Sequence, residues 1–227
     1  MVKFEFEKIV IILSAIFFLF LSVNFSPQIL GIIYVIFIAW YYFFILDSDV
    51  GQFPLYRGKF DLVSLVPVVC ILVFVWFTVT LVVSNALGAN VTSQMLFKVL
   101  GSQTTPPFVS NNEFLRLFIL CFAIPLAETL FFFGVVLSYI VQVLHVNLAR
   151  FDRSWIIASI STASIMTIFH LAVQFSTQWA LLSTFIFAFI SSIIVLRYRD
   201  LSYALMFHVI ANTLIVTNLL QYIMIGW

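Results

Sequence analysis

The sequence predicts an all-α fold, a polytopic membrane bundle of about seven transmembrane helices. Of its 227 residues, 64% are apolar and only 8% are charged, whereas soluble domains are about 45–50% apolar and about 25% charged. So few charges cannot cover a water-soluble surface, and most of the chain must therefore be solvated by lipid. Its apolar runs reach the roughly 20 residues that a spanning helix needs, and they lack the short alternating pattern of barrel strands.

Seven apolar segments are long enough to span a membrane. They cover residues 9–24, 28–46, 62–84, 114–145, 154–174, 179–196 and 201–225. We expect a single membrane domain over residues 1–227, with a three-helix part in residues 1–84 and a four-helix part in residues 114–225. Pro125 lies inside the fourth segment and should weaken the local hydrogen-bond ladder, because proline has no backbone N–H.

The longest connection between segments, residues 85–113, contains an amphipathic stretch at residues 91–100. This stretch forms either a short interfacial helix or part of an ordinary structured loop. The net charge of +1 gives no sign of the clustered basic face that nucleic-acid binding requires. We therefore expect membrane lipid, and no nucleic acid, among the partners of the chain.

The basic residues predict how the helices are oriented. With seven spans, eight of the ten Lys and Arg residues fall on the face that holds the N-terminus. These eight are Lys3, Lys8, Arg57, Lys59, Arg150, Arg153, Arg197 and Arg199, and the two on the opposite face are Lys98 and Arg116. The positive-inside rule then places the N-terminus in the cytoplasm and the C-terminus outside.

One carboxylate, that of Glu128, lies deep in a predicted span, whereas the other acidic residues fall in tails, in loops or at a helix edge. A carboxylate in a membrane costs several kcal/mol unless it is paired or protonated. An intramembrane ionisable group is therefore a functional-site hypothesis by default. The alternative is that Glu128 joins helices through a hydrogen bond and has a structural role only.

Two histidines and an asparagine lie in other predicted spans. His170 is in the fifth segment, and His208 and Asn212 are in the seventh, four residues apart and therefore on one helical face. Each of them alone would more often be a structural hydrogen bonder. Together with Glu128 they predict a site: a Glu beside a His can hold and deprotonate a water, and a second His with an Asn can donate to an oxyanion.

The order and spacing of these residues resemble the CPBP intramembrane protease family, which includes the CAAX prenyl proteases and the Abi-type bacteriocin-processing proteins. The first motif of that family is Glu-Glu-x-x-x-Arg, often followed by Gly. It corresponds here to residues 128–134, Glu-Thr-Leu-Phe-Phe-Phe-Gly. Thr129 thus replaces the second Glu, and Phe133 replaces the Arg.

The second and third motifs of the family are closer to its pattern. Phe-x-x-x-His ends here at His170, with Met166 in place of Phe. The third motif, His-x-x-x-Asn, is intact from His208 to Asn212. The resemblance covers about residues 114–218.

The resemblance implies a glutamate-type intramembrane endopeptidase that hydrolyses a peptide bond of a membrane-associated substrate. Glu128 and His170 would activate the hydrolytic water, and His208 with Asn212 would form the oxyanion site. Thr129 and Phe133, which replace charged residues of the motif, would contact the substrate. The resemblance implies no cofactor, although one Glu and two His are also plausible zinc ligands.

The two replaced motif residues leave more than one interpretation open. Loss of both charges removes a buried pair without leaving either charge stranded. The chain is then either an active variant with altered substrate selection or a catalytically degenerate scaffold, a subunit of a membrane-protein complex. A proton-coupled carrier is less favoured, because the sequence lacks the internal repeat that carriers use.

The predicted helix boundaries place the two histidines at different depths. At about 1.5 Å per residue, His170 would lie ~24 Å from the cytoplasmic start of its span and His208 only ~10 Å from the start of its own. They can meet only if the last hairpin begins inside the membrane, or if the fifth helix begins below it. Arg197, Arg199 and Asp200 would then line a polar cavity open to the cytoplasm.

Overall fold

The described part of the protein is built from helices. The computed structural model describes Phe53 and residues 62–88, 117–174 and 178–216, and every regular element within these ranges is helical. The elements are α3 (Leu62–Ala86), η2 (Ile119–Ala123), α6 (Ile124–Glu128), η3 (Thr129–Val136), α7 (Leu137–Val143), α8 (Arg153–Gln174), α9 (Gln178–Tyr198) and α10 (Leu201–Val216). The all-α prediction is confirmed for these residues.

Four helices of the described part are long and apolar enough to cross a membrane: Leu65–Ala86, Ile119–Val143, Arg153–Leu171 and Gln178–Tyr198. The apolar helix α10 is shorter. The protein is therefore an integral, multi-pass membrane protein. Four parts of the predicted topology lie outside the described residues: the spans at 9–24 and 28–46, the stretch at 91–100, and the end of the 201–225 span. The total of seven spans and the orientation in the membrane therefore remain predictions.

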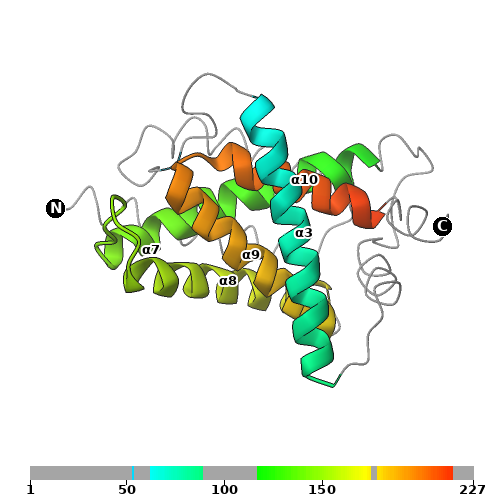
Figure 1. Cartoon of the computed structure of the whole chain (residues 1–227). Coiled ribbons are helices and arrows are strands. Elements are labelled where there is room, and N and C mark those ends of the chain that lie inside the picture. Colours follow the sequence, from blue (N-terminus) through cyan, green and yellow to red (C-terminus); the bar gives the residue numbers. More distant parts are fainter. Residues whose placement is uncertain (1–52, 54–61, 89–116, 175–177, 217–227) are drawn as a thin grey trace.

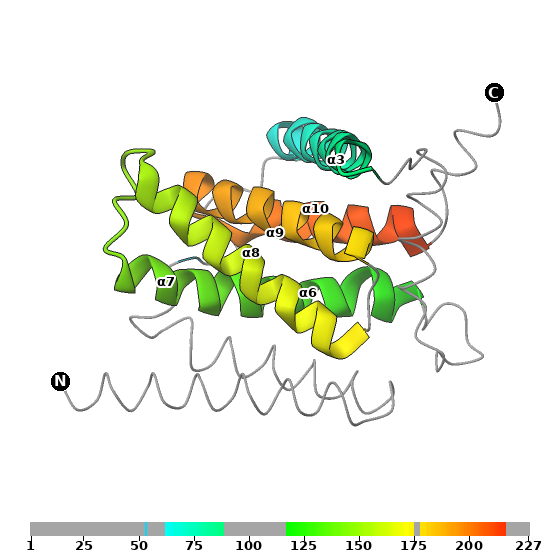
Figure 2. The same cartoon turned by 90° about the horizontal axis from the view of Figure 1, so that it is seen from below.

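The helices lie in three layers, which can be told apart in the view of Figure 2. α3 forms one outer layer and packs against α9 and α10. The long helix from η2 to α7 lies on the other side of α10, and α8 packs along α9 and beside α7 (Figures 1 and 2). α9 and α10 are therefore covered from both sides, so polar side chains on their inward faces are shielded.

The helix in residues 119–143 is irregular around Pro125. Two π-helical turns, η2 and η3, flank the single α-helical turn α6 that contains this proline and Glu128. π-Helical turns inside α-helices are uncommon and often lie at functional sites. The weakening of the hydrogen-bond ladder that Pro125 predicts is thus observed, as a change of hydrogen-bond register.

Two tight turns connect the helices at one end of the bundle. Asp152 caps α8 by accepting a hydrogen bond from the Ser154 backbone N–H at 2.8 Å, and the Ser154 hydroxyl, which also donates to this carboxylate, lowers the pKa of Asp152. In the α9–α10 turn, Asp200 accepts from the Ser202 N–H at 2.7 Å. Arg199 there has φ 53°, a left-handed conformation that ends α9 and reverses the chain.

Trp76 attaches the outer helix α3 to the inner layer. It is 3% exposed, its indole N–H donates to the Ser183 carbonyl on α9 at 3.1 Å, and its ring packs edge-on against Phe187 and Phe207. On the outer face of the same helix, Phe74 is 69% exposed. α3 thus presents one face to the bundle and the other to lipid.

We predict that Trp76→Ala lowers the free energy of unfolding by about 3 kcal/mol, because truncation of a buried aromatic leaves a cavity and loses a hydrogen bond. Thermal unfolding of the purified protein in detergent would measure the loss. Phe74→Ala is the matched control on the lipid-facing side and should change the stability much less. Equal losses in the two variants would contradict this account of how α3 is attached.

Candidate active site

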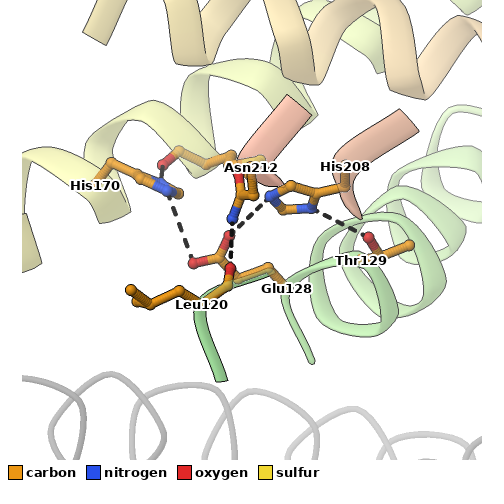
Figure 3. Close-up of polar contacts among 7 residues, drawn as sticks. Leu120, Glu128, Thr129, His170, His208 and Asn212 are labelled. Atoms are coloured by element: carbon orange, nitrogen blue, oxygen red, sulfur yellow. Dashed lines mark hydrogen bonds and ion pairs between the residues drawn. The ribbon is translucent and has the colours of Figure 1, made fainter. Parts of the chain in front are cut away.

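Three helices bring Glu128, His170 and His208 together in the interior of the bundle. Glu128 ends α6, His170 lies near the end of α8, and His208 lies in the middle of α10. Glu128 Oε1 is 3.8 Å from His170 Nε2, and Glu128 Oε2 is 3.4 Å from His208 Nε2 (Figure 3). All three residues are buried, with 4–8% of their surface exposed. Residues that are 80 positions apart along the chain thus share one carboxylate.

The orientation of His170 is set by its own helix. Its Nδ1 lies 2.9 Å from the Met166 carbonyl oxygen, one turn earlier on α8. A carbonyl can only accept, so Nδ1 carries the hydrogen and donates it. In the neutral ring Nε2 then has a lone pair, and it is this atom that faces Glu128. The neutral form of His170 therefore presents an acceptor to the carboxylate, whereas the protonated form would make an ion pair with it.

His208 has the opposite arrangement. Its Nδ1 lies 3.3 Å from the Thr129 hydroxyl, and its Nε2 faces the Glu128 carboxylate (Figure 3). Because an ionised carboxylate only accepts, the favourable neutral tautomer has its hydrogen on Nε2 and receives the Thr129 O–H at Nδ1. His208 therefore presents a donor to Glu128, whereas His170 presents an acceptor.

Aromatic rings hold both imidazoles in place. Phe187 of α9 packs against His208 with ring centroids 4.6 Å apart, and Phe169 lies 5.9 Å from His170. Phe169 in turn packs against Phe132 of η3. This apolar packing restricts ring rotation and keeps the local dielectric low, which strengthens the polar contacts of Glu128.

Asn212 lies one turn after His208 on α10, but its amide contacts the backbone. Its Nδ2 donates to the Leu120 carbonyl oxygen at 3.1 Å (Figure 3). This bond ties α10 to η2, the π-helical turn that precedes Pro125. Asn212 is only partly buried, and its second amide N–H remains available for another acceptor.

The predicted depth mismatch between helices is present in the structure. Residues 153 to 170 cover about 25 Å from the start of α8 to His170, whereas residues 201 to 208 cover about 10 Å from the start of α10 to His208. Since both histidines face the Glu128 carboxylate, α10 begins closer to the site than α8 does. The polar cavity predicted at Arg197, Arg199 and Asp200 remains a prediction.

The remaining predicted site residues are buried beside this cluster. Thr129 is fully buried next to His208, and Phe133 is fully buried in the apolar core. Their contact with a substrate remains a prediction. As for the zinc alternative, no group of three His, Cys, Asp or Glu in the described ranges has the spacing of a metal site.

The sequence did not indicate every contributor to the site. The Met166 and Leu120 carbonyls are backbone groups, and Phe187 lies on a helix without any motif. The i−4 spacing of Met166 and His170 could have suggested the first contact. The contact to Leu120 requires knowledge of the π-helical register, and Phe187 could be placed only by tertiary packing.

A comparison with family models matched residues 110–214 to the family described as type II CAAX prenyl endopeptidase Rce1-like. Neither the curated proteins nor the solved structures gave a match. The matched residues extend from before η2 into α10 and include Glu128, His170, His208 and Asn212. The family match confirms the predicted resemblance, and the C-terminal part of this membrane protein is similar to the CAAX prenyl endopeptidases.

Proposed function

We propose that this protein is an intramembrane endopeptidase that hydrolyses a peptide bond of a membrane-associated substrate. The observation that carries the proposal is a single buried carboxylate with an imidazole acceptor at one oxygen and an imidazole donor at the other. The two sides are chemically different, so they can serve different parts of one reaction. The similarity of residues 110–214 to a protease family supports this assignment.

The acceptor side suits the nucleophilic water. Glu128 Oε1 and His170 Nε2 are 3.8 Å apart, beyond direct hydrogen-bond distance. Two acceptors at this separation can share a water that donates one O–H to each. Such a water has its lone pairs directed away from both groups and can attack a carbonyl carbon. Glu128 with His170 would take up its proton as general base.

The donor side suits the oxyanion. When water oxygen bonds to the carbonyl carbon, negative charge develops on the carbonyl oxygen. The Nε2–H of His208 faces Glu128 Oε2, and it would turn to this oxygen once Glu128 has taken up the water proton and needs the donor less. The second amide N–H of Asn212, also on α10, would donate to the same oxygen. Collapse of the intermediate breaks the C–N bond, and Glu128 returns the proton to the leaving amine. One water is consumed, and an acid and an amine are formed.

The second candidate is a catalytically degenerate scaffold within a membrane-protein complex. Thr129 and Phe133 favour it, because they are uncharged where the family has Glu and Arg. Two observations favour the protease. Glu128 contacts both His170 and His208, and Asn212 is held beside them by the Leu120 carbonyl. The two candidates differ in whether conservative changes at Glu128 alter the processing of any membrane protein.

We predict that Glu128→Gln and His170→Ala each reduce proteolysis by roughly 10²–10⁴-fold, because each removes part of the general base. The measurement compares peptide termini of membrane proteins in cells that express the wild type or a variant as the only copy. A substrate would accumulate in its unprocessed form in both variants.

Activity of the wild type should persist with a zinc chelator present, since no step requires a metal.

His145→Asn is the matched histidine control, because His145 is exposed at the end of α7 and asparagine tolerates its positive φ of 49°. It should process substrate like the wild type. Each variant must also reach the membrane and melt at a temperature near that of the wild type. Identical termini in wild type, Glu128→Gln and His170→Ala would rule out proteolysis and leave the scaffold.

We predict that Thr129→Val lowers activity about tenfold, equivalent to ~1.4 kcal/mol, because His208 loses the hydrogen bond that favours its Nε2–H tautomer. Valine keeps the shape of threonine without its hydroxyl, and Thr129→Ser keeps the hydroxyl. The tautomer can be measured directly by NMR of protein labelled with ¹⁵N at histidine. The Nδ1 and Nε2 resonances of His208 should move in the Val variant and remain in the Ser variant.

Unchanged His208 resonances in Thr129→Val would show that the hydroxyl does not select the tautomer. Loss of activity in Thr129→Ser equal to that in Thr129→Val would show that the role of residue 129 is steric. Direct substrate contact by Thr129 predicts a raised KM with unchanged histidine resonances, so the two roles are separable.

A further inference from the structure

The π-helical turn before Glu128 has a gap in its hydrogen-bond ladder. In η2, the Ile124 N–H bonds to the Ile119 carbonyl, five residues back, as a π-helix requires. In this register, the Leu120 carbonyl should receive the N–H of residue 125. Residue 125 is proline and has no N–H. The Leu120 carbonyl therefore lacks the backbone donor that its neighbour has.

A side chain from another helix fills this gap. The Leu120 carbonyl accepts Asn212 Nδ2 at 3.1 Å. Leu120 is 4% exposed, and α10 packs directly against η2 and α6. In a membrane interior a carbonyl without a donor costs several kcal/mol, because neither water nor lipid can replace the bond. The amide of Asn212 thus stands in for the missing backbone N–H.

We propose that Asn212 is a positioning residue whose amide replaces the N–H absent at Pro125, and thereby stabilises the π-helical turn that orients Glu128. A π-helical turn accommodates one more residue than an α-helical turn. Its loss would rotate the following residues by about 100° about the helix axis. Glu128 lies three residues after Pro125, so its direction toward the two imidazoles depends on this turn. The inference concerns folding and does not require that the protein hydrolyse anything.

The bond also orients the Asn212 side chain. Since the Leu120 carbonyl accepts, the NH₂ group of the amide must lie on that side. One of its two hydrogens is committed to Leu120, and only the other can reach a substrate. Asn212 would then donate one hydrogen to the Leu120 carbonyl in η2 and the other to an oxyanion. An amide can do both because its NH₂ group has two hydrogens, whereas a hydroxyl has only one.

The test is a double-mutant cycle between positions 212 and 125, with thermal unfolding in detergent as the readout. Asn212→Leu removes the donor and keeps the number of side-chain heavy atoms. When residue 125 is proline, it should lower Tm by roughly 5–10 °C, because a carbonyl in a membrane interior then loses its donor. Pro125→Ala restores a backbone N–H that can bond to Leu120. In that background, Asn212→Leu should lower Tm by less than half as much.

Ser138→Ala is the control for additivity. The Ser138 hydroxyl donates to the Gly134 carbonyl at 2.6 Å within the same long helix, more than a turn away from Pro125. Its removal should cost the same in both backgrounds, because distant sites add. If Asn212→Leu does not fold with Pro125 present, recovery of folded protein by Pro125→Ala is the expected rescue.

Equal losses for Asn212→Leu in the two backgrounds, or failure to fold in both, would overturn the proposal. The outcome is separate from the proposed hydrolysis. The double variant still lacks the Asn212 amide as an oxyanion donor, so it should regain stability without regaining full activity. A protein with no proteolytic activity at all would still show the coupling in Tm.

Discussion

The buried carboxylate of Glu128 is the constraint on which the rest of this structure depends. An isolated carboxylate in a membrane interior is costly, so it is tolerated only where other polar groups meet it. The two imidazoles that do so come from α8 and α10. Three helices must therefore approach one point. The short helix α10 fits this view, since it needs to reach Glu128 from only about 10 Å away.

Small side chains are buried on both α8 and α9, which pack against each other. Ala158, Thr162 and Ala163 on α8, with Ala188 and Ser192 on α9, are all fully buried. The hydroxyls of Thr162 and Ser192 donate to carbonyls of their own helices and need no partner across the interface. In lipid, helix association relies on such close packing because apolar burial gives little advantage. The sheltered interior that results is what makes the contacts of Glu128 strong.

Residue type and spacing predicted the apolar helices of the described part and the grouping of Glu128, His170 and His208, because both follow from local pattern and from an intramembrane charge. The roles of these residues and of Asn212 in a reaction remain predictions. The tautomers of His170 and His208 were not predictable. They depend on the Met166 carbonyl and on the Thr129 hydroxyl, and the second contact requires a register between α10 and η3 that no periodicity specifies. Pro125 predicted a weak ladder, but only the fold shows that Asn212 compensates for it.

Thr129 has a consequence for the charge of the site. A carboxylate at the Nδ1 of His208 would favour a doubly protonated, cationic ring between two anions. A hydroxyl is neutral, so it can orient the ring without a charge. The family motif has a glutamate at position 129 and an arginine at position 133. Because residue 129 here is threonine, no carboxylate is left without a partner when residue 133 is phenylalanine, and Phe133 can pack in the apolar core. The two replacements thus fit each other, because residue 129 orients His208 through a neutral hydroxyl and residue 133 adds no unpaired charge to the core.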